Sequence, residues 1–315
     1  MKMLGRVLLT LFLLLGPSSW SVGQDSFVIR VGVVTYETFQ DKDGELRALI
    51  NQLSGSQNPP VRFQIASGSY REVSHWLQTG EIDLALLTAG GYVRGILQSG
   101  LIDQYEYLAT MDARPGIGPW VNDSRKADKF QRYYHSVCLA HAENGELTMG
   151  DIERAAEGGT LEVLLVHPQS ASGALVPQRV MQDLGIDLPE KTTRFMHSHS
   201  QVLEAIAKRR AGVTTIGFVW DDAISKQPEL QSEIVKVEIP ALDRVQIPHD
   251  VLVCRRDFPQ LAELKRMLTE QVFTQPRPLF LPSDDGDQDY IVLQQSLGLE
   301  SDSSQDQPFQ QHQPW

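Results

Sequence analysis

The segment from Leu161 to Met181 constrains the fold more than any other part of this sequence. An apolar run leads into the small-residue turn Gln169-Ser170-Ala171-Ser172-Gly173, and a helical pattern follows at once. This order predicts a strand, a tight turn and the first turn of a helix. The free N–H groups of a first helical turn carry partial positive charge, so amides and hydroxyls there can hold a phosphate-like oxyanion. Serine is also a common helix N-cap, so the turn alone is equally compatible with a structural role.

The first 23 residues have the layout of a secretory signal. Lys2 and Arg6 precede the apolar run Val7–Leu15, and small residues follow up to Gly23. The run is too short to cross a bilayer, and no cysteine follows it to carry a lipid anchor. An uncleaved anchor is the alternative, because Trp20 fits poorly near a cleavage site. We therefore expect an exported mature chain located in the periplasm.

Charge and length limit the partners and the architecture. The formal charge is −12, and it becomes −14 when the two basic residues of the leader are removed. An acidic surface of this kind argues against nucleic acid or an anionic membrane as partner. A mature chain of about 290 residues exceeds the usual single core, so we expect two lobes. Two cysteines are too few for a disulfide scaffold.

Strand and helix patterns alternate along the body of the chain, which predicts an α/β fold with a largely parallel sheet in each lobe. The expected strands are Phe27–Val34, Val61–Ala66, Ile82–Leu87, Tyr133–His141, Leu161–His167 and Val213–Val219. The expected helices are Gly44–Leu53, Ser69–Leu77, Tyr92–Gln98, Gly173–Leu184, Ser200–Arg210 and, as the last one, Gln260–Val272.

Polar side chains follow four of these strands. The groups are Thr35-Tyr36, Ser67-Gly68-Ser69-Tyr70, Thr88-Ala89-Gly90-Gly91-Tyr92 and Ser170–Gly173. Ligands of such sheets bind at the carboxyl ends of the strands. The four groups converge only if the two halves face each other across a cleft, which is the geometry of a hinged binding protein.

Five segments in order carry a family resemblance: SGSYREVSHWLQTGEIDLALLTAGGYV, YYHSVCLAHAENGELTMGDI, HPQSASGALVPQRVM, HSHSQVLEAIAKRRAG and IPHDVLVCRRDFP. Together they resemble the phosphonate/phosphite/phosphate-type substrate-binding proteins of ABC transporters, over almost all of Phe27–Val272. The resemblance implies a type II periplasmic-binding fold, in which two α/β lobes are joined by two crossing strands and clamp the ligand. The expected parts are a signal peptide at 1–23, lobe 1 at 24–112 plus 247–299, lobe 2 at 113–246 and a disordered tail at 300–315.

The resemblance also implies which residues bind the ligand. The family holds its oxyanion with a Ser-Thr-Ser-Gly turn, and a histidine at the start of the next helix adds a donor. The expected ligand-binding residues here are Ser170, Ala171, Ser172, Gly173, His199, Tyr92, Tyr36 and Thr88. Ala171 departs from the family's threonine, and the missing hydrogen bond to an anion is worth roughly 1.5–3 kcal/mol. A buried or rim position is the alternative for Tyr92.

A second departure concerns ligands that carry an amine. The family's Gly-x-Val-Asp is here Gly212-Val213-Thr214-Thr215, so its carboxylate is missing. Asp221 is a candidate to replace that carboxylate, although acids after a strand are commonly helix caps. The expected ligand is therefore phosphate, phosphite or a simple phosphonate, and the sequence does not decide among them.

Enzyme and metal functions find little support. His197 and His199 lack the carboxylate or cysteine companions of a zinc site. His141-Ala142-Glu143 resembles part of a zinc deaminase motif, but the Pro-Cys-x-x-Cys partner is missing. Neither a Gly-x-Ser-x-Gly elbow nor a P-loop is present. We expect a monomeric, non-enzymatic protein without cofactor.

Two alternatives stay open at this stage. The protein either delivers its ligand to an ABC permease or presents it to a membrane sensor such as a histidine kinase, and the neighbouring genes would distinguish these roles. The resemblance places Cys138 and Cys254 in the strands at the two crossings. Neighbouring thiols in an oxidising compartment can form a disulfide, whereas buried free cysteines are the other possibility.

Overall fold

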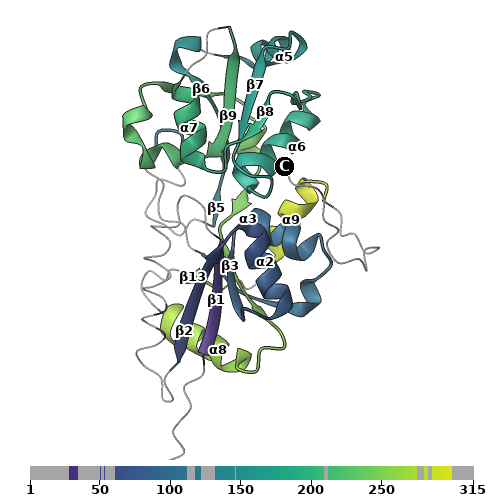
Figure 1. Ribbon diagram of the computed structural model, residues 1–315, viewed down its shortest axis with the longest axis vertical. Helices are drawn as coiled ribbons and strands as arrows, with labels where there is room; N and C mark the ends of the chain where they lie inside the picture. The colour runs from purple at the N-terminus through teal and green to yellow at the C-terminus, as the bar shows by residue number, and fades with distance from the viewer. Residues whose placement is uncertain are drawn as a thin grey trace, which may run out of the picture.

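The protein has two lobes stacked along its long axis (Figure 1). This computed structural model describes residues 28–34, 50, 53, 61–111, 118–121, 132–145, 147–208, 212–274, 280–282 and 286–299. The expected signal peptide, Tyr36, most of the helix expected at Gly44–Leu53 and the tail at 300–315 lie outside the described residues.

Lobe 1 is built on a sheet with the strand order β13-β4-β12-β3-β1-β2. Strands β2, β1 and β3 run parallel, whereas β12 is antiparallel to β3 and to β4. The strands are β1 Val28–Val34, β2 Arg62–Gly68, β3 Leu84–Leu87, β4 Tyr105–Met111, β12 Val251–Arg255 and β13 Phe280–Leu281. The main helices are α2 Tyr70–Thr79, α3 Ala89–Tyr92 continuing as the π-helix η1 Val93–Leu97, α8 Leu261–Met267 continuing as η8 Leu268–Val272, and α9 Gln288–Ser296.

Lobe 2 repeats this design with the order β10-β6-β9-β7-β8. Strands β9, β7 and β8 are parallel, and β6 returns antiparallel between β9 and β10. The strands are β6 Ser136–His141, β7 Leu161–Leu165, β8 Thr193–Phe195, β9 Thr214–Trp220 and β10 Ile234–Val237. The main helices are α5 Met149–Glu157, the π-helix η4 Ala171–Leu175 continuing as α6 Val176–Asp183, and α7 His199–Ala207.

Two short strands form the hinge between the lobes. Strand β5, Tyr133–Tyr134, pairs antiparallel with β11, Ile247–Pro248, and the pair lies between the two sheets (Figure 1). One apolar cluster includes Val73 and Leu87 of lobe 1 together with Leu165 and Met181 of lobe 2. The two-lobed α/β architecture with a hinge of crossing strands is therefore confirmed.

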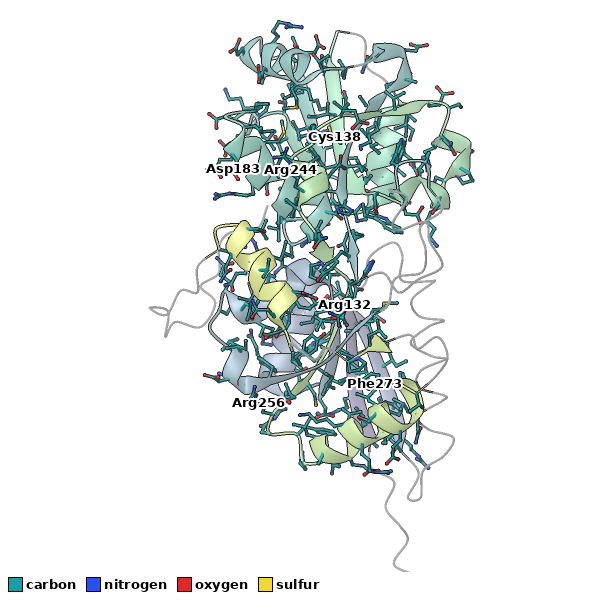
Figure 2. All side chains as sticks on the ribbon, turned by 180° about the vertical axis from the view of Figure 1, so that it is seen from behind. Arg132, Cys138, Asp183, Arg244, Arg256 and Phe273 are labelled. Carbon is teal, nitrogen blue, oxygen red and sulfur yellow. The ribbon has the colours of Figure 1, made fainter. Side chains whose placement is uncertain are left out.

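The expectation that Cys138 and Cys254 lie at the crossings is wrong. Each cysteine lies beyond its crossing, where the chain has already entered a different sheet: Cys138 pairs with Phe218 and Cys254 with Leu84. Both are buried free thiols, and Figure 2 shows Cys138 inside lobe 2. Burial raises the pKa of Cys254 to about 12, so the thiol stays protonated. No disulfide tethers the hinge through these residues.

The sequence patterns missed several elements, among them β4, β8, β10, α5 and α9. Helix α9 follows the segment expected to be the last helix, and its sequence QDYIVLQQS explains the omission. Its apolar residues are consecutive rather than spaced at helical intervals, so the period gives no signal.

Candidate functional site

Lobe 2 contributes the turn that opened the sequence argument. Ser170 is the N-cap of the helix, and its Oγ accepts a hydrogen bond from the N–H of Gly173 at 3.1 Å. A Cβ on Gly173 would lie 2.3 Å from Cγ2 of Val166, so only glycine fits between the turn and the strand end. The predicted strand, turn and helix are confirmed, and the hydroxyl-bearing turn lies at the carboxyl end of β7.

Lobe 1 contributes a turn of the same design at the end of β3. Thr88 is the N-cap of α3, and its Oγ1 accepts from the N–H of Gly91 at 3.1 Å. A Cβ on Gly90 would lie 2.0 Å from the carbonyl oxygen of Gln169 and 3.0 Å from the amide nitrogen of Ala171. The first turns of two helices, one from each lobe, are therefore in backbone contact.

An aromatic pair joins the lobes beside this contact. Tyr70, the first residue of α2, stacks on the ring of His167 with centroids 4.6 Å apart and planes inclined by 10°. The Tyr70 side chain is hydrogen-bonded to that of Thr88, and burial raises the pKa of Tyr70, which keeps its hydroxyl protonated. Burial, together with the charge of His197, lowers the pKa of His167. Its Nδ1 accepts from the N–H of Gln169 at 3.2 Å, so the neutral ring carries its proton on Nε2.

The hinge supplies a third wall. Tyr134 of β5 has a side-chain hydrogen bond to Ser172, and burial raises the pKa of the Tyr134 hydroxyl. Its ring packs against His249, with centroids 4.8 Å apart, and edge-on against Trp220 at 6.5 Å. The hydroxyl of Ser136 donates to the backbone oxygen of Ser172 at 2.6 Å. Ser172 is thus held by hydrogen bonds to both its side chain and its backbone.

His199 lies at the start of the next helix, as expected. It is the first residue of α7, and the N-cap Ser198 accepts from the N–H of Gln201 at 3.1 Å. Two residues before His199, the backbone N–H of His197 donates to the carbonyl of Val166 at 2.7 Å. Helix α7 therefore begins beside the end of β7. His197 has a positive φ of 67°, the only such value at a non-glycine among the described residues. The chain accepts this unfavourable backbone conformation where α7 is brought to the site.

Four helices of this region begin with a hydroxyl N-cap. The caps are Ser69, Thr88, Ser170 and Ser198. The helices meet through the contacts of Tyr70, Gly90 and His197 described above, so the partial positive charges of their first turns add at one place. The arrangement is chemically suited to an anion with several oxygen atoms, and least suited to a cation.

Two buried carboxylates stand at the hinge side of this region. Asp221 is 1% exposed, its N–H donates to the carbonyl of His135 at 3.0 Å, and its Oδ2 is 3.9 Å from the imidazole of the same residue. Asp222, rather than Asp221, occupies the cap position of the following turn. A contact between Asp221 and a ligand amine stays a prediction.

Tyr92 lies in a different environment from the other expected residues. Its hydroxyl donates to Asp287 at 3.0 Å, and its ring packs edge-on against Tyr290 with centroids 5.0 Å apart. The side chain is 2% exposed and faces α9. A ligand contact for Tyr92 is therefore still a prediction, as it is for Tyr36, which lies outside the described residues.

Sequence reasoning did not assign three residues that the structure brings together: Tyr70, Tyr134 and His167. Tyr70 belongs to one of the polar groups that follow the expected strands, and His167 is the last residue of the expected strand Leu161–His167. Their positions near strand ends were therefore noted, but no function was assigned to them. Nothing in the sequence pattern points to Tyr134, because its neighbours Ser172 and His249 are far away along the chain.

Two further properties concern metals and membranes. Within the described ranges, no group of three or more His, Cys, Asp or Glu side chains has an arrangement suited to a metal ion. None of the helices in the same ranges is sufficiently long and apolar for a membrane span.

Comparison with known proteins gives one family and several similar structures. The family model "ABC transporter, phosphonate, periplasmic substrate-binding protein" matches residues 31–274. No curated protein matched the chain. A binding-protein component of a phosphonate ABC transporter from Pseudomonas aeruginosa is 18% identical, with 84% of this chain and 78% of that chain covered and a TM-score of 0.59.

Two other solved structures have the same fold. A Prochlorococcus marinus protein solved in complex with methylphosphonate is 14% identical, with 86% and 98% of the two chains covered and a TM-score of 0.62. A Xanthomonas citri protein bound to chloride is also 14% identical, with 86% and 97% covered and a TM-score of 0.61. At these identities the likeness establishes the two-lobed fold and leaves the ligand to be argued from the site.

Proposed function

This chain belongs to the phosphonate family of periplasmic substrate-binding proteins of ABC transporters, and from that premise we propose that it binds phosphate, phosphite or a simple phosphonate between its lobes. Closure of the lobes on the oxyanion then produces the form that docks on an ABC permease. The proposal places a monomeric protein in the periplasm and assigns it no catalytic step.

The contact between the two helix starts carries this proposal. Gly90 of lobe 1 and Gln169 of lobe 2 approach so closely that no side chain fits between them. Helix starts concentrate unpaired N–H groups, and two that face each other repel unless an anion or a polar group lies near them. An oxyanion beside this contact accepts hydrogen bonds from both lobes, so binding and closure stabilise each other.

Six of the eight expected ligand-binding residues have a chemical role in this proposal. The hydroxyl of Ser172, the amide of Ala171 and the imidazole of His199 donate to the oxyanion from lobe 2. Ser170 and Gly173 define the shape of the turn, because the Ser170 hydroxyl accepts a hydrogen bond from the N–H of Gly173. Thr88 and Tyr70, which are hydrogen-bonded to each other, complete the site from lobe 1.

Phosphonate ligands with an amine are less favoured by this proposal than ligands without one. Thr215, which stands in place of the family's acid, donates its hydroxyl to Glu162 at 3.0 Å. Glu162 in turn pairs with Arg194 at 2.8 Å, so this carboxylate is already neutralised by a cation of its own sheet. The remaining candidate to bind an ammonium group is Asp221.

Calorimetric titration with phosphate, phosphite, methylphosphonate, 2-aminoethylphosphonate and sulfate tests the proposal. We expect binding of at least one of the first three, and each of Ser172→Ala and His199→Ala weakens it by roughly tenfold or more, because a charged acceptor loses a donor. Ala171→Thr restores the family's hydroxyl and is expected to tighten binding.

Ser99→Ala serves as the matched control. Ser99 follows the far end of the helix that Thr88 caps, and its hydroxyl donates to the carbonyl of Arg94. The nine helical residues of α3 and η1 separate it from Thr88 by roughly 14 Å at about 1.5 Å per residue. The proposal is overturned if no oxyanion of the set binds, or if Ser172→Ala and His199→Ala both bind as the control does.

A further inference from the structure

Helix α9 lies between the two lobes and beside the hinge. It begins near α3 of lobe 1 and ends close to α6 of lobe 2 (Figures 1 and 2). Tyr290 is fully buried, Leu293 is 1% exposed, and Val292 on the opposite side is 54% exposed. The helix therefore presents one face to the body of the protein and one to solvent.

The hydroxyl of Tyr290 holds the second crossing segment. It donates to the carbonyl of His249 at 2.6 Å, in the segment between β11 and β12. It also lies 3.1 Å from Oγ1 of Thr110, whose hydroxyl is 2.5 Å from that of Tyr107. A buried hydroxyl in such a chain is costly to leave unpaired, so this part of the hinge is fixed to α9 and β4.

The neighbouring residue of α9 holds the first crossing strand. Tyr133 of β5 donates its hydroxyl to the carboxylate of Asp289 at 2.8 Å. The backbone of Tyr133 pairs with that of Pro248 in β11. Successive residues of one helix turn, Asp289 and Tyr290, are thus bonded to both crossings.

The C-terminal end of α9 reaches lobe 2. A Cβ on Gly298 would lie 2.7 Å from Nη1 of Arg179, a residue of α6. Leu297 and Tyr290 also belong to the apolar cluster that contains residues of both lobes. Helix α9 is therefore bonded to the hinge at its start and packed on the other lobe at its end.

We propose that α9 is a hinge brace, in which Tyr290 and Asp289 are positioning residues that favour the arrangement with the lobes in contact. The brace touches no ligand; it raises the population of the form that binds. The inference rests on the proposed function for the ligand, but the geometry of the hinge is measurable without one. In a variant with a weakened brace, a smaller fraction of the protein has its lobes in contact. Its apparent affinity falls in proportion to that fraction.

Tyr290→Phe and Tyr133→Phe test the brace, because each removes one hydroxyl and keeps the ring. Val292→Ala is the control on the exposed face of the same helix. We expect a larger radius of gyration in solution scattering of the ligand-free variants, and affinity for methylphosphonate weakened by about threefold to tenfold per hydrogen bond. The double variant should show both effects more strongly, and the control should match the wild type.

Unfolding temperature, scattering radius and affinity together distinguish a residue that positions the lobes from one that only stabilises the fold. If Tyr290→Phe and Tyr133→Phe lower the unfolding temperature but leave both the scattering radius and the affinity at wild-type values, the brace is overturned. If Tyr290→Phe does not fold, Tyr133→Phe and Asp289→Ala decide, since both remove a half-buried hydrogen bond rather than part of the core. If the wild type binds none of the oxyanions, the proposed function fails, while scattering of the ligand-free variants still decides the brace.

Discussion

The two helix starts that meet between the lobes have similar sequences, but their glycines pack against different parts of the molecule. Thr88-Ala89-Gly90-Gly91 in lobe 1 and Ser170-Ala171-Ser172-Gly173 in lobe 2 both follow a buried strand. Both use a hydroxyl N-cap that accepts from the third residue of the helix at 3.1 Å. Their local structure is the same because the same cap chemistry specifies it.

The difference lies in what surrounds each glycine. Gly173 is pressed against Val166 of its own lobe, so it is needed for lobe 2 to fold. Gly90 is pressed against the backbone of Gln169, across the lobe boundary, so it is needed only when the lobes meet. One motif therefore serves folding in one lobe and closure in the other.

Gly90→Ala should have the largest effect, and it should act on binding. The added Cβ meets a carbonyl oxygen at 2.0 Å, and backbone cannot yield as a side chain can. We expect affinity for methylphosphonate to fall about 100-fold or more, equivalent to about 2.7 kcal/mol, with the unfolding temperature nearly unchanged. Calorimetry and thermal unfolding measure the two quantities.

Gly150→Ala is the control for that substitution. Gly150 lies in α5, and its nearest neighbour to an added Cβ is Nη1 of Arg154 at an ordinary 3.5 Å. We expect unchanged binding and slightly higher stability, because alanine favours helix. Equal affinity of Gly90→Ala and Gly150→Ala would show that the lobes need not meet for binding.

In contrast to Gly90→Ala, Gly173→Ala should mainly lower the stability of the protein. Overpacking against Val166 is expected to lower the free energy of unfolding by about 1–3 kcal/mol. Denaturant unfolding measures this loss, and Gly90→Ala measured beside it supplies the contrast. A Gly173→Ala protein as stable as Gly90→Ala would remove the distinction between the two glycines.

The two N-caps, Thr88 and Ser170, should contribute equally to stability. Thr88→Ala and Ser170→Ala each remove the acceptor for one first-turn N–H, so each is expected to lower the free energy of unfolding by about 1 kcal/mol. Thr274→Ala, which deletes a hydroxyl bonded to the exposed carbonyl of Glu270, should stay within about 0.5 kcal/mol of wild type. A cost confined to one lobe would mean that the two starts are not equivalent.

The smallest expected effect concerns pH and the Tyr70–His167 stack. Because burial lowers the pKa of His167 below its ordinary 6.5, the folded protein binds fewer protons there than the unfolded chain. His167 therefore destabilises the fold as pH falls from 7 to 5 and has no such effect above this range. Relative to wild type, His167→Gln should reduce the fall in unfolding temperature across this range by at most about 2 °C. Parallel curves for the two proteins would contradict the prediction.

Much of the fold was predictable because local patterns and tertiary structure agree. The strand expected at Leu161–His167, observed as Leu161–Leu165, the Ser170 turn and the helix after it were predicted correctly, since burial on both faces and a cap leave clear signals. Helix α9 was missed, because its apolar residues are consecutive in the sequence and form no periodic stripe. Cys138 and Cys254 were misplaced, because no local pattern says at which residue a crossing strand enters its sheet.

By itself, the sequence determined the α/β class, the hydroxyl caps at the strand ends and the family. These depend on side-chain chemistry and periodicity within a few residues. Only the tertiary structure decided that Tyr70 stacks on His167, that Tyr134 holds Ser172 and that Tyr290 holds the hinge. Each of these contacts joins residues far apart in the chain, so it exists only once the lobes have folded and met.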